Sequence, residues 1–277
     1  MTVHPLTKPK PQDRIKVMII KTDSEGKCQA QGGPATCEDT DCPEGGAAKQ
    51  EVAAKLGVIA DYSKFHPKLA IAFNDAFANT KQMLPDIKLP GVTSADDAYS
   101  VLAQKGLYDL NQDPDYDVMS PETKKELAYR LAEHAAEKIK KAAESSNFEM
   151  EHIGSYDVIC VPKQNTDDYQ KLEERTAQAR KEGKVSVGSV QGLINHEIAH
   201  GINNQLGISN IPEVRTLYKA FVAYSNPSHL SMRAMSDIDE FISEGWGEYM
   251  SEATPRPIAQ YLGKTIIDKY NEMYPER

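Results

Sequence analysis

Apolar residues recur at helical spacing along most of this chain of 277 residues, whereas continuous apolar runs are short and few. Two runs rich in β-branched residues, Ile15–Ile20 and Tyr156–Lys163, predict strands. Helices are predicted over approximately residues 47–56, 66–83, 94–105, 120–145, 167–181, 189–207, 212–224, 236–252 and 258–274. Many helices, few strands and no internal repeat predict an α+β fold, mostly helical with a small β-sheet.

The first 14 residues differ in composition from the rest of the chain. Residues 1–14 are rich in proline and lysine, which predicts a linker or tether. The remaining residues, 15–277, have the length and the apolar content of one large folded domain. We therefore expect a single domain that follows a short N-terminal tether.

The charge and hydropathy of the chain exclude several classes of partner. The formal net charge is −9 and no basic block offsets it, which argues against a general nucleic-acid binder. No apolar run is long enough to span a bilayer, and residues 1–14 lack the apolar core of a secretory signal peptide. If the protein leaves its cell, we expect a route that needs no signal peptide.

Three of the four cysteines, Cys28, Cys37 and Cys42, cluster in a segment rich in glycine, proline and aspartate, and the fourth is Cys160. Two interpretations remain open. The segment is either a disulfide-stapled loop, which requires an oxidising compartment, or a loop that carries free thiols. A zinc knuckle is disfavoured because the spacings are irregular and no C-x-x-C pair occurs. We favour at least one disulfide.

The sequence from His196 to His200 reads H-E-I-A-H, an H-E-x-x-H motif. On a helix, His196 and His200 project from one face, four residues apart, and that spacing suits two ligands of a tetrahedral zinc ion. Glu197 lies beside the open position of such an ion, where a carboxylate can take a proton from zinc-bound water. The motif predicts a zinc hydrolase.

The surroundings of the motif support a helix that is buried along one side. Ser189 is suited to cap its N-terminus and Gly207 to end it. The apolar positions that repeat at helical spacing are Val190, Leu193, Ile194 and Ile198. The alternative is an amphipathic helix whose His and Glu side chains face solvent, and this context, with the second motif described below, favours the functional interpretation. We therefore interpret the motif as a metal site.

Two histidines leave zinc short of a protein ligand, and catalytic sites often complete the set with a carboxylate. No third histidine follows His200 at the spacing of the three-histidine motif. Residues 243–249 read S-E-G-W-G-E-Y. This stretch resembles the N-E-G-F-A-x-Y segment of gluzincin aminopeptidases, in which the glutamate before the glycine binds zinc. The resemblance implies that Glu244 is the third ligand.

Glu248 is open to two interpretations. In thermolysin-like gluzincins a carboxylate four residues after the ligand steadies a ligand histidine, and Glu248 stands at that spacing from Glu244. Alternatively, residues 248–253 (E-Y-M-S-E-A) resemble the ligand segment of lethal-factor-type gluzincins, which would make Glu248 the ligand. We favour Glu244 as ligand and Glu248 as its supporting carboxylate, because the E-G-W-G match is the tighter one.

A hydrolase of this kind also needs a donor that stabilises the oxyanion of the reaction. The candidates that lie near the motifs in sequence are Tyr218, Tyr224, His229, Tyr249 and Tyr261. His229 would resemble the corresponding histidine of thermolysin-like enzymes, although a surface histidine in a turn is the alternative. We retain His229 and Tyr224 as candidate catalytic residues.

Taken together, the motifs resemble those of gluzincin zinc metallopeptidases, which implies a zincin-like metallopeptidase domain over residues 15–277. The long spacing from His200 to Glu244, the Pro/Lys-rich start and the missing signal peptide look like the C-terminal metallopeptidase toxin domain of an evolved type VI secretion spike protein (VgrG). That resemblance implies a spike-protein tether, an immunity protein and delivery to the periplasm of a target bacterium or to a host cell. It also implies a peptide or protein substrate.

The expected mechanism is conventional for a zinc peptidase. Zinc held by His196, His200 and Glu244 lowers the pKa of a bound water, and Glu197 takes the proton and passes it to the leaving nitrogen. Two alternatives remain open: a zinc amidase that acts on cell-wall peptide crosslinks, and a non-catalytic effector domain that binds a partner. An intact Glu197 argues against the second, because a structural zinc site needs no general base.

Overall fold

The computed structural model describes residues 43–145, 150–224 and 226–275. These residues belong to one unit of the chain, Pro43–Arg277, which is divided from residues 1–42. The predicted tether, the predicted strand Ile15–Ile20 and the cysteine cluster lie outside the described residues. The predicted boundary between residues 14 and 15 is therefore untested.

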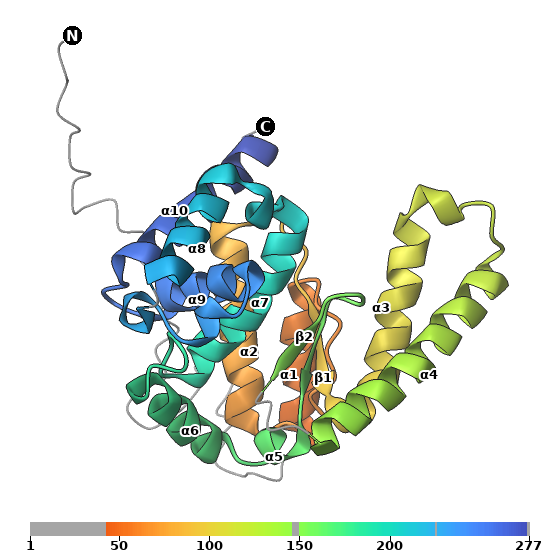
Figure 1. Ribbon diagram of the computed structural model, residues 1–277. Coiled ribbons are helices and arrows are strands. Elements are labelled where there is room, and N and C mark those ends of the chain that lie inside the picture. The colour runs from red at the N-terminus through yellow and green to blue at the C-terminus, as the bar shows by residue number, and fades with distance from the viewer. Residues whose placement is uncertain (1–42, 146–149, 225, 276–277) are drawn as a thin grey trace, which may run out of the picture. The chain divides into compact units, whose positions relative to one another are not determined.

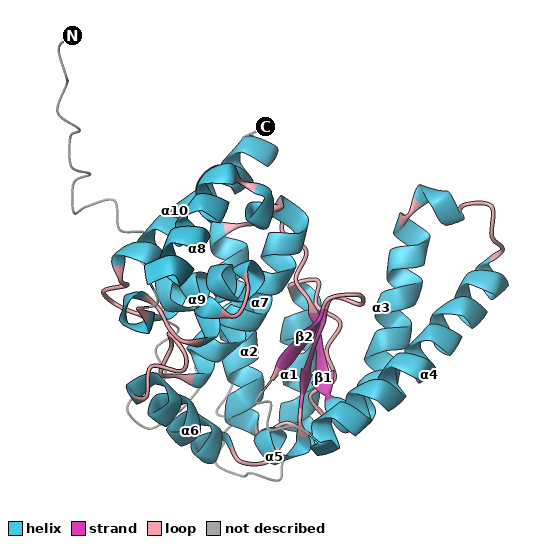
Figure 2. Ribbon diagram, viewed as in Figure 1, coloured by secondary structure: helices cyan, strands magenta, loops and turns pink. Residues whose placement is uncertain are grey.

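Most of the described chain is helical, as the apolar pattern predicted, and a small sheet completes an α+β fold (Figures 1 and 2). The helices are α1 (Pro43–Lys55), α2 (Pro67–Met83), α3 (Ala98–Gln112), α4 (Pro121–Ser145), α5 (Lys163–Thr166), α6 (Tyr169–Lys181), α7 (Val190–Leu206), α8 (Pro212–Tyr224), α9 (Ile238–Ser251) and α10 (Pro257–Met273). The strands are β1 (Gly91–Ser94), β2 (Glu151–Ile153) and β3 (Val158–Val161). None of the described helices is long and apolar enough to cross a membrane.

The sheet has the order β1-β3-β2, with β1 parallel and β2 antiparallel to β3. All four residues of β3 are buried, which explains why its sequence is a continuous apolar run. Only β3 falls within a predicted strand; β1 and β2 have four and three residues, too few to show alternation. β3 is therefore the central strand and is paired along both edges.

α7 forms the centre of the helical body, and its apolar side chains belong to the main core together with those of α2, α9 and α10. Glycine allows α7 and α9 to approach closely. A Cβ on Gly247 would lie 3.1 Å from the carbonyl oxygen of Gly192 and 3.3 Å from the Cβ of His196. The same helix uses Gly245 toward α10, where a Cβ would lie 2.3 Å from Leu262 Cδ1. These contacts fix how α9 presents its carboxylates to α7.

A second apolar cluster joins α3 and α4 to the sheet. The two helices pack as a hairpin that extends from β1 and β3, on the opposite side of the sheet from α7 (Figure 1). Cys160 in β3 belongs to this cluster and is a free, fully buried thiol. Burial raises its pKa to about 12, so the thiol stays protonated and unreactive at neutral pH. Cys160 therefore has no disulfide partner among the described residues.

Candidate metal centre

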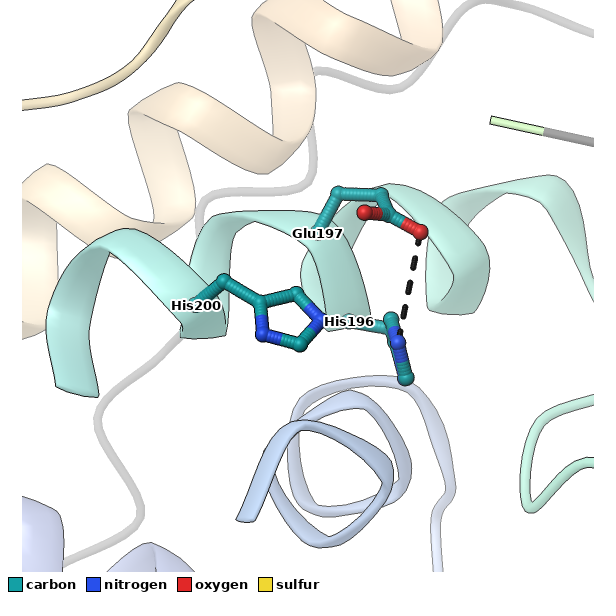
Figure 3. A group of neighbouring side chains, drawn as sticks. All are labelled: His196, Glu197 and His200. Atoms are coloured by element: carbon teal, nitrogen blue, oxygen red, sulfur yellow. Dashed lines mark ion pairs between the residues drawn. The ribbon is translucent and has the colours of Figure 1, made fainter. Parts of the chain in front are cut away.

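The H-E-x-x-H segment lies in the middle of α7, and the predicted caps of that helix are confirmed. The Ser189 side chain accepts a hydrogen bond from the Gly192 N–H at 3.1 Å. Gly207 ends the helix in the left-handed conformation, with φ of 65°. His196 and Glu197 are buried and His200 is partly exposed. Figure 3 shows the two imidazole rings on the same side of α7.

α9 faces this segment with a row of carboxylates, Glu240, Glu244 and Glu248, one on each successive turn. The helix begins after Asp237, whose side chain accepts the Glu240 N–H at 2.8 Å. The sequence had predicted that this helix begins near residue 236. The cap at Asp237 places Glu240 in the first turn of α9, directly opposite the histidines.

Glu240 reaches both histidines of the motif. Its Oε2 lies 3.1 Å from His196 Nε2, and its Oε1 lies 3.8 Å from His200 Nε2. Ligand atoms of a tetrahedral zinc site, with bonds of 2.0–2.1 Å, lie about 3.3 Å from one another. The three groups therefore have the types of a zinc ligand set, and a different oxygen of Glu240 approaches each histidine. Among the described residues, the groups whose ligand atoms all lie within 4.8 Å of one another are His196 with Glu197 and His200, and His196 with Glu240 and Glu244. The sequence analysis did not identify Glu240.

Glu244 approaches His196 from the other side of the ring. Its Oε1 lies 3.1 Å from His196 Nδ1, and its Oε2 accepts a hydrogen bond from the Ser186 N–H. The Ser186 hydroxyl donates to the Glu244 carbonyl oxygen at 2.7 Å. One metal ion does not take both nitrogens of one imidazole. Glu244 therefore lies where it can orient the His196 ring through Nδ1. It does not lie on the Nε2 side of the ring, where Glu240 lies.

Glu248 is buried but is committed to arginine. It accepts hydrogen bonds from the Arg256 Nε at 2.9 Å and from the Arg256 backbone N–H at 2.7 Å. Nη1 of Arg180 lies 3.8 Å from Oε2 of Glu248. No contact in the described structure joins Glu248 to a histidine of the motif. Its carboxylate anchors the segment after α9, and the structure supports neither of its predicted roles at the metal.

The two oxygens of Glu197 have different surroundings. Oε2 accepts the backbone N–H of His152, in β2, at 2.8 Å. Oε1 has no hydrogen-bond partner in the described structure, although it is buried, and it lies 4.0 Å from His196 Nε2, as the dashed line in Figure 3 marks. One oxygen thus fixes the side chain, and the other is available to a reacting proton.

His152 also touches the second histidine. Its ring stacks on His200, with ring centroids 5.9 Å apart and planes 10° apart. Its Nε2 lies 2.9 Å from Asp157 Oδ1, and Asp157 has a left-handed φ of 50°. A Cβ on Gly201 would lie 2.9 Å from that same oxygen, so glycine is needed where α7 passes this pair. β2 therefore supports both Glu197, the candidate base, and His200, a candidate ligand.

The charges of the cluster are strongly coupled. Burial and the neighbouring Arg233 act to lower the pKa of His196. The carboxylates of Glu240 and Glu244 outweigh both effects and raise that pKa to about 9. Burial, together with the charge on His196, lowers the pKa of His200 to about 3, so His200 is neutral and its Nε2 is free to bind a metal. Burial raises the pKa of Glu197 above its ordinary value.

The predicted oxyanion donors are not brought to the cluster. Tyr224 is 82% exposed at the end of α8, and His229 is exposed in the 3-10 turn Pro227–His229. Tyr218 donates to the Met235 carbonyl oxygen instead, at 3.4 Å. Tyr249 stacks on Trp246, and Tyr261 lines a surface groove. Proximity in sequence was therefore a poor guide to proximity in space.

The cluster contains four residues that the sequence analysis missed: Glu240, Arg233, His152 and Asp157. Glu240 had a signal, since it stands one turn before Glu244 on the same predicted helix face. The other three come from short segments that reach the site only through tertiary packing.

Comparison of the chain with protein family models, curated proteins and solved structures found no match.

Proposed function

We propose that this protein is a zinc-dependent hydrolase of peptide bonds. The observation that carries the proposal is the buried Oε1 of Glu197, which accepts no hydrogen bond among the described residues. It lies 4.0 Å from His196 Nε2, which has no aligned hydrogen bond either. A buried polar atom without a hydrogen-bond partner destabilises the fold, and such atoms are therefore typical of functional sites. A general base at Glu197 Oε1 and a metal ligand at His196 Nε2 would explain why both atoms lack a hydrogen bond.

The donor set fits a divalent cation. Two imidazole nitrogens and one carboxylate, from His196, His200 and Glu240, form the usual ligand set of a hydrolytic zinc site. With His196 neutral, as a metal ligand must be, the ionised forms of Glu197, Glu240 and Glu244 would carry three negative charges against one positive charge on Arg233. A divalent ion would supply the other two. We therefore assign the third ligand to Glu240 and the orientation of His196 to Glu244.

Each residue then has a defined task. Zinc, when bound, would supply a Lewis acid that activates water and polarises a carbonyl group. Glu197 takes the proton of the attacking water at Oε1, while the His152 N–H holds Oε2 in place. Glu197 then passes the proton to the leaving nitrogen. The pKa of Glu197, raised by burial, favours this exchange because a weaker acid is a better base.

The test compares wild type with Glu197→Gln. We expect both proteins to bind about one zinc per chain, measured by elemental analysis, and only wild type to cleave a mixed peptide library. Glu126→Gln is the matched control, because Glu126 is an exposed carboxylate on α4. Equal cleavage by Glu197→Gln and wild type would refute the proposed role of the base. Absence of zinc from wild type would refute the metal site.

The same pair of proteins defines the substrate class. Incubation with purified peptidoglycan, beside the peptide library, separates a peptidase from an amidase that cuts cell-wall crosslinks. Delivery as a secreted toxin remains a prediction from the resemblance of the motifs. Expression in the cytoplasm and, behind an added signal peptide, in the periplasm of a bacterium tests it: only periplasmic wild type should be toxic.

A further inference from the structure

Arg233 reaches the cluster from a short segment between α8 and α9. It opens the 3-10 helix Arg233–Met235. Its backbone N–H donates to the Lys184 carbonyl oxygen at 3.0 Å, and the Met232 N–H donates to the Gly183 carbonyl oxygen at 2.8 Å. These bonds tie the segment to the turn that precedes α7. The arginine therefore starts from a fixed point of the backbone.

The guanidinium group lies between the proposed ligand and the proposed base. Its Nε donates to Glu240 Oε2 at 2.8 Å, and its Nη2 lies 3.9 Å from Glu197 Oε1. No other lysine or arginine among the described residues pairs with either carboxylate. The Arg233 side chain is 32% exposed, so the carboxylates that it faces do not close it off from a ligand.

Arg233 lies where the reaction would need a hydrogen-bond donor for the oxyanion, a role that the predicted donors do not fill. When water attacks a peptide carbonyl group, the electron pair of the C=O bond moves onto the carbonyl oxygen, which becomes negative. Tyr224 and His229 are exposed and make no contact with the cluster. An arginine offers five N–H donors in a planar fork, so bonding Nε to Glu240 leaves the Nη groups for a second oxygen.

We propose that Arg233 is a catalytic residue that donates a hydrogen bond to the oxyanion formed during hydrolysis. The inference rests on the proposed function. In the step concerned, a C–O bond forms between water and the carbonyl carbon, one water proton moves to Glu197, and the negative oxygen accepts an Nη–H from Arg233. The C–N bond then breaks, the C=O bond re-forms, and Glu197 gives its proton to the leaving nitrogen.

The geometry also explains why a side chain this close to a ligand is arginine. Lysine has one ammonium group on a flexible chain, whereas the guanidinium group can hold Glu240 through one edge and an oxygen through another. The bond to Glu240 fixes the plane of the fork before substrate arrives. A preorganised donor of this kind loses little free energy to reorientation during the reaction.

The experiment uses inorganic phosphate, a tetrahedral anion, as the probe and cobalt(II) as a spectroscopic replacement for zinc. Wild type, Arg233→Gln and the matched control Arg130→Gln are loaded at saturating cobalt, and the visible absorption of the metal is followed as phosphate is added. Among the described residues, Arg130 forms an ion pair only with Glu126, on the exposed face of α4. We expect all three proteins to bind cobalt and Arg233→Gln to bind phosphate roughly 10- to 100-fold more weakly.

Peptide hydrolysis supplies the second readout. An oxyanion donor acts in the transition state, so Arg233→Gln should lower kcat by at least about tenfold with little change in KM. A raised KM with an unchanged kcat would instead assign Arg233 to a carboxylate of the substrate and would overturn the inference. Phosphate affinity equal to that of wild type, or failure of Arg233→Gln to load cobalt, would overturn it too.

The two proposals fail in different ways. If wild type binds no cobalt, the proposed metal site is wrong and the inference falls with it. If wild type binds cobalt and cleaves peptides, and Arg233→Gln does both equally well, only the inference about Arg233 is wrong.

Discussion

Oε2 of Glu240 lies 3.1 Å from Nε2 of His196, on the side of the imidazole ring opposite to the carboxylate of Glu244. The ring is thus held between carboxylates from consecutive turns of α9. Of these two carboxylates, Glu240 is the one that also lies close to His200, with its Oε1 3.8 Å from His200 Nε2. We therefore assign different tasks to the two glutamates, because a ligand role for Glu244 would place the proposed ion at Nδ1 of His196, away from His200.

Removal of each carboxylate should affect zinc affinity to a different extent. We expect Glu240→Gln to weaken zinc binding by more than about 100-fold, because it replaces a charged ligand. Glu244→Gln should weaken it by about 10- to 100-fold, the usual effect of losing a partner of a ligand histidine. Competition with a coloured chelator measures both affinities.

Glu252→Gln, at the C-terminal end of the same helix, is the control and should bind zinc as wild type does. A larger loss of affinity in Glu244→Gln than in Glu240→Gln would reverse our assignment and restore Glu244 as the ligand.

Zinc binding should depend on pH through His196. In protein without metal its pKa is about 9, so at pH 7 zinc must displace a proton from the ring. We expect zinc affinity, corrected for buffer, to rise about tenfold per pH unit from pH 7 and to level off as pH passes about 9. Calorimetry in buffers of different ionisation enthalpy counts the released protons. Affinity independent of pH across this range would contradict the proposed pKa.

The same proton affects folding stability. The pKa of His196 is raised from 6.5 to about 9 in the fold, so its contribution is complete below about pH 6.5 and is lost as pH rises through about 9. Protein without metal should therefore melt at a lower temperature at pH 9 than at pH 6.5, as scanning fluorimetry would show. Zinc-loaded protein, in which the ring binds metal, is the comparison and should not show this loss. Equal shifts in both forms would argue against His196 as the cause.

Asp157 should control activity through His152. We expect Asp157→Asn to keep zinc and stability, because asparagine tolerates the left-handed backbone, but to lower activity by about tenfold as the His152 ring loses its anionic partner. Asp157→Gly, which also accepts that backbone, should behave in the same way. Wild-type activity in both variants would show that the pair between His152 and Asp157 has no part in the reaction.

The packing of α9 against α10 should depend on Gly263. A Cβ at this position would lie 2.2 Å from Cγ of Tyr249, so Gly263→Ala forces the ring to move. We expect a loss of about 1–3 kcal/mol in the free energy of unfolding, measured with urea. Gly106→Ala in α3 is the control: its Cβ would meet nothing closer than 3.8 Å, and alanine should stabilise that helix slightly. Equal stability of the two variants would contradict the described packing.

The motif helix was predictable because its signals are local. Ser189 caps the N-terminus of α7 and Gly207 ends the helix, and the buried stripe of α7 can be recognised from the spacing of its apolar residues. The row of carboxylates on α9 was equally visible in the sequence. Which of them faces Nε2 was not, because that depends on the close approach at Gly247 and Gly192, which joins residues far apart in the chain.

The elements around the motif were less predictable for the same reason. β1 and β2 are short, and their pairing with β3 supplies the order that their own residues do not. β2 brings His152 to Glu197, and the turn before α7 anchors Arg233. His229 and Tyr224 had the right chemistry and the right neighbourhood in sequence, but their segment leaves them exposed.

The most direct test of the central assignment is the position of the bound metal. Crystals of zinc-loaded protein, measured on both sides of the zinc absorption edge, would locate the ion by its anomalous scattering. Our account predicts one peak at bonding distance from Nε2 of His196, Nε2 of His200 and the carboxylate of Glu240, with Glu197 beside it. A peak between Nδ1 of His196 and Glu244, or no peak in this cluster, would contradict it.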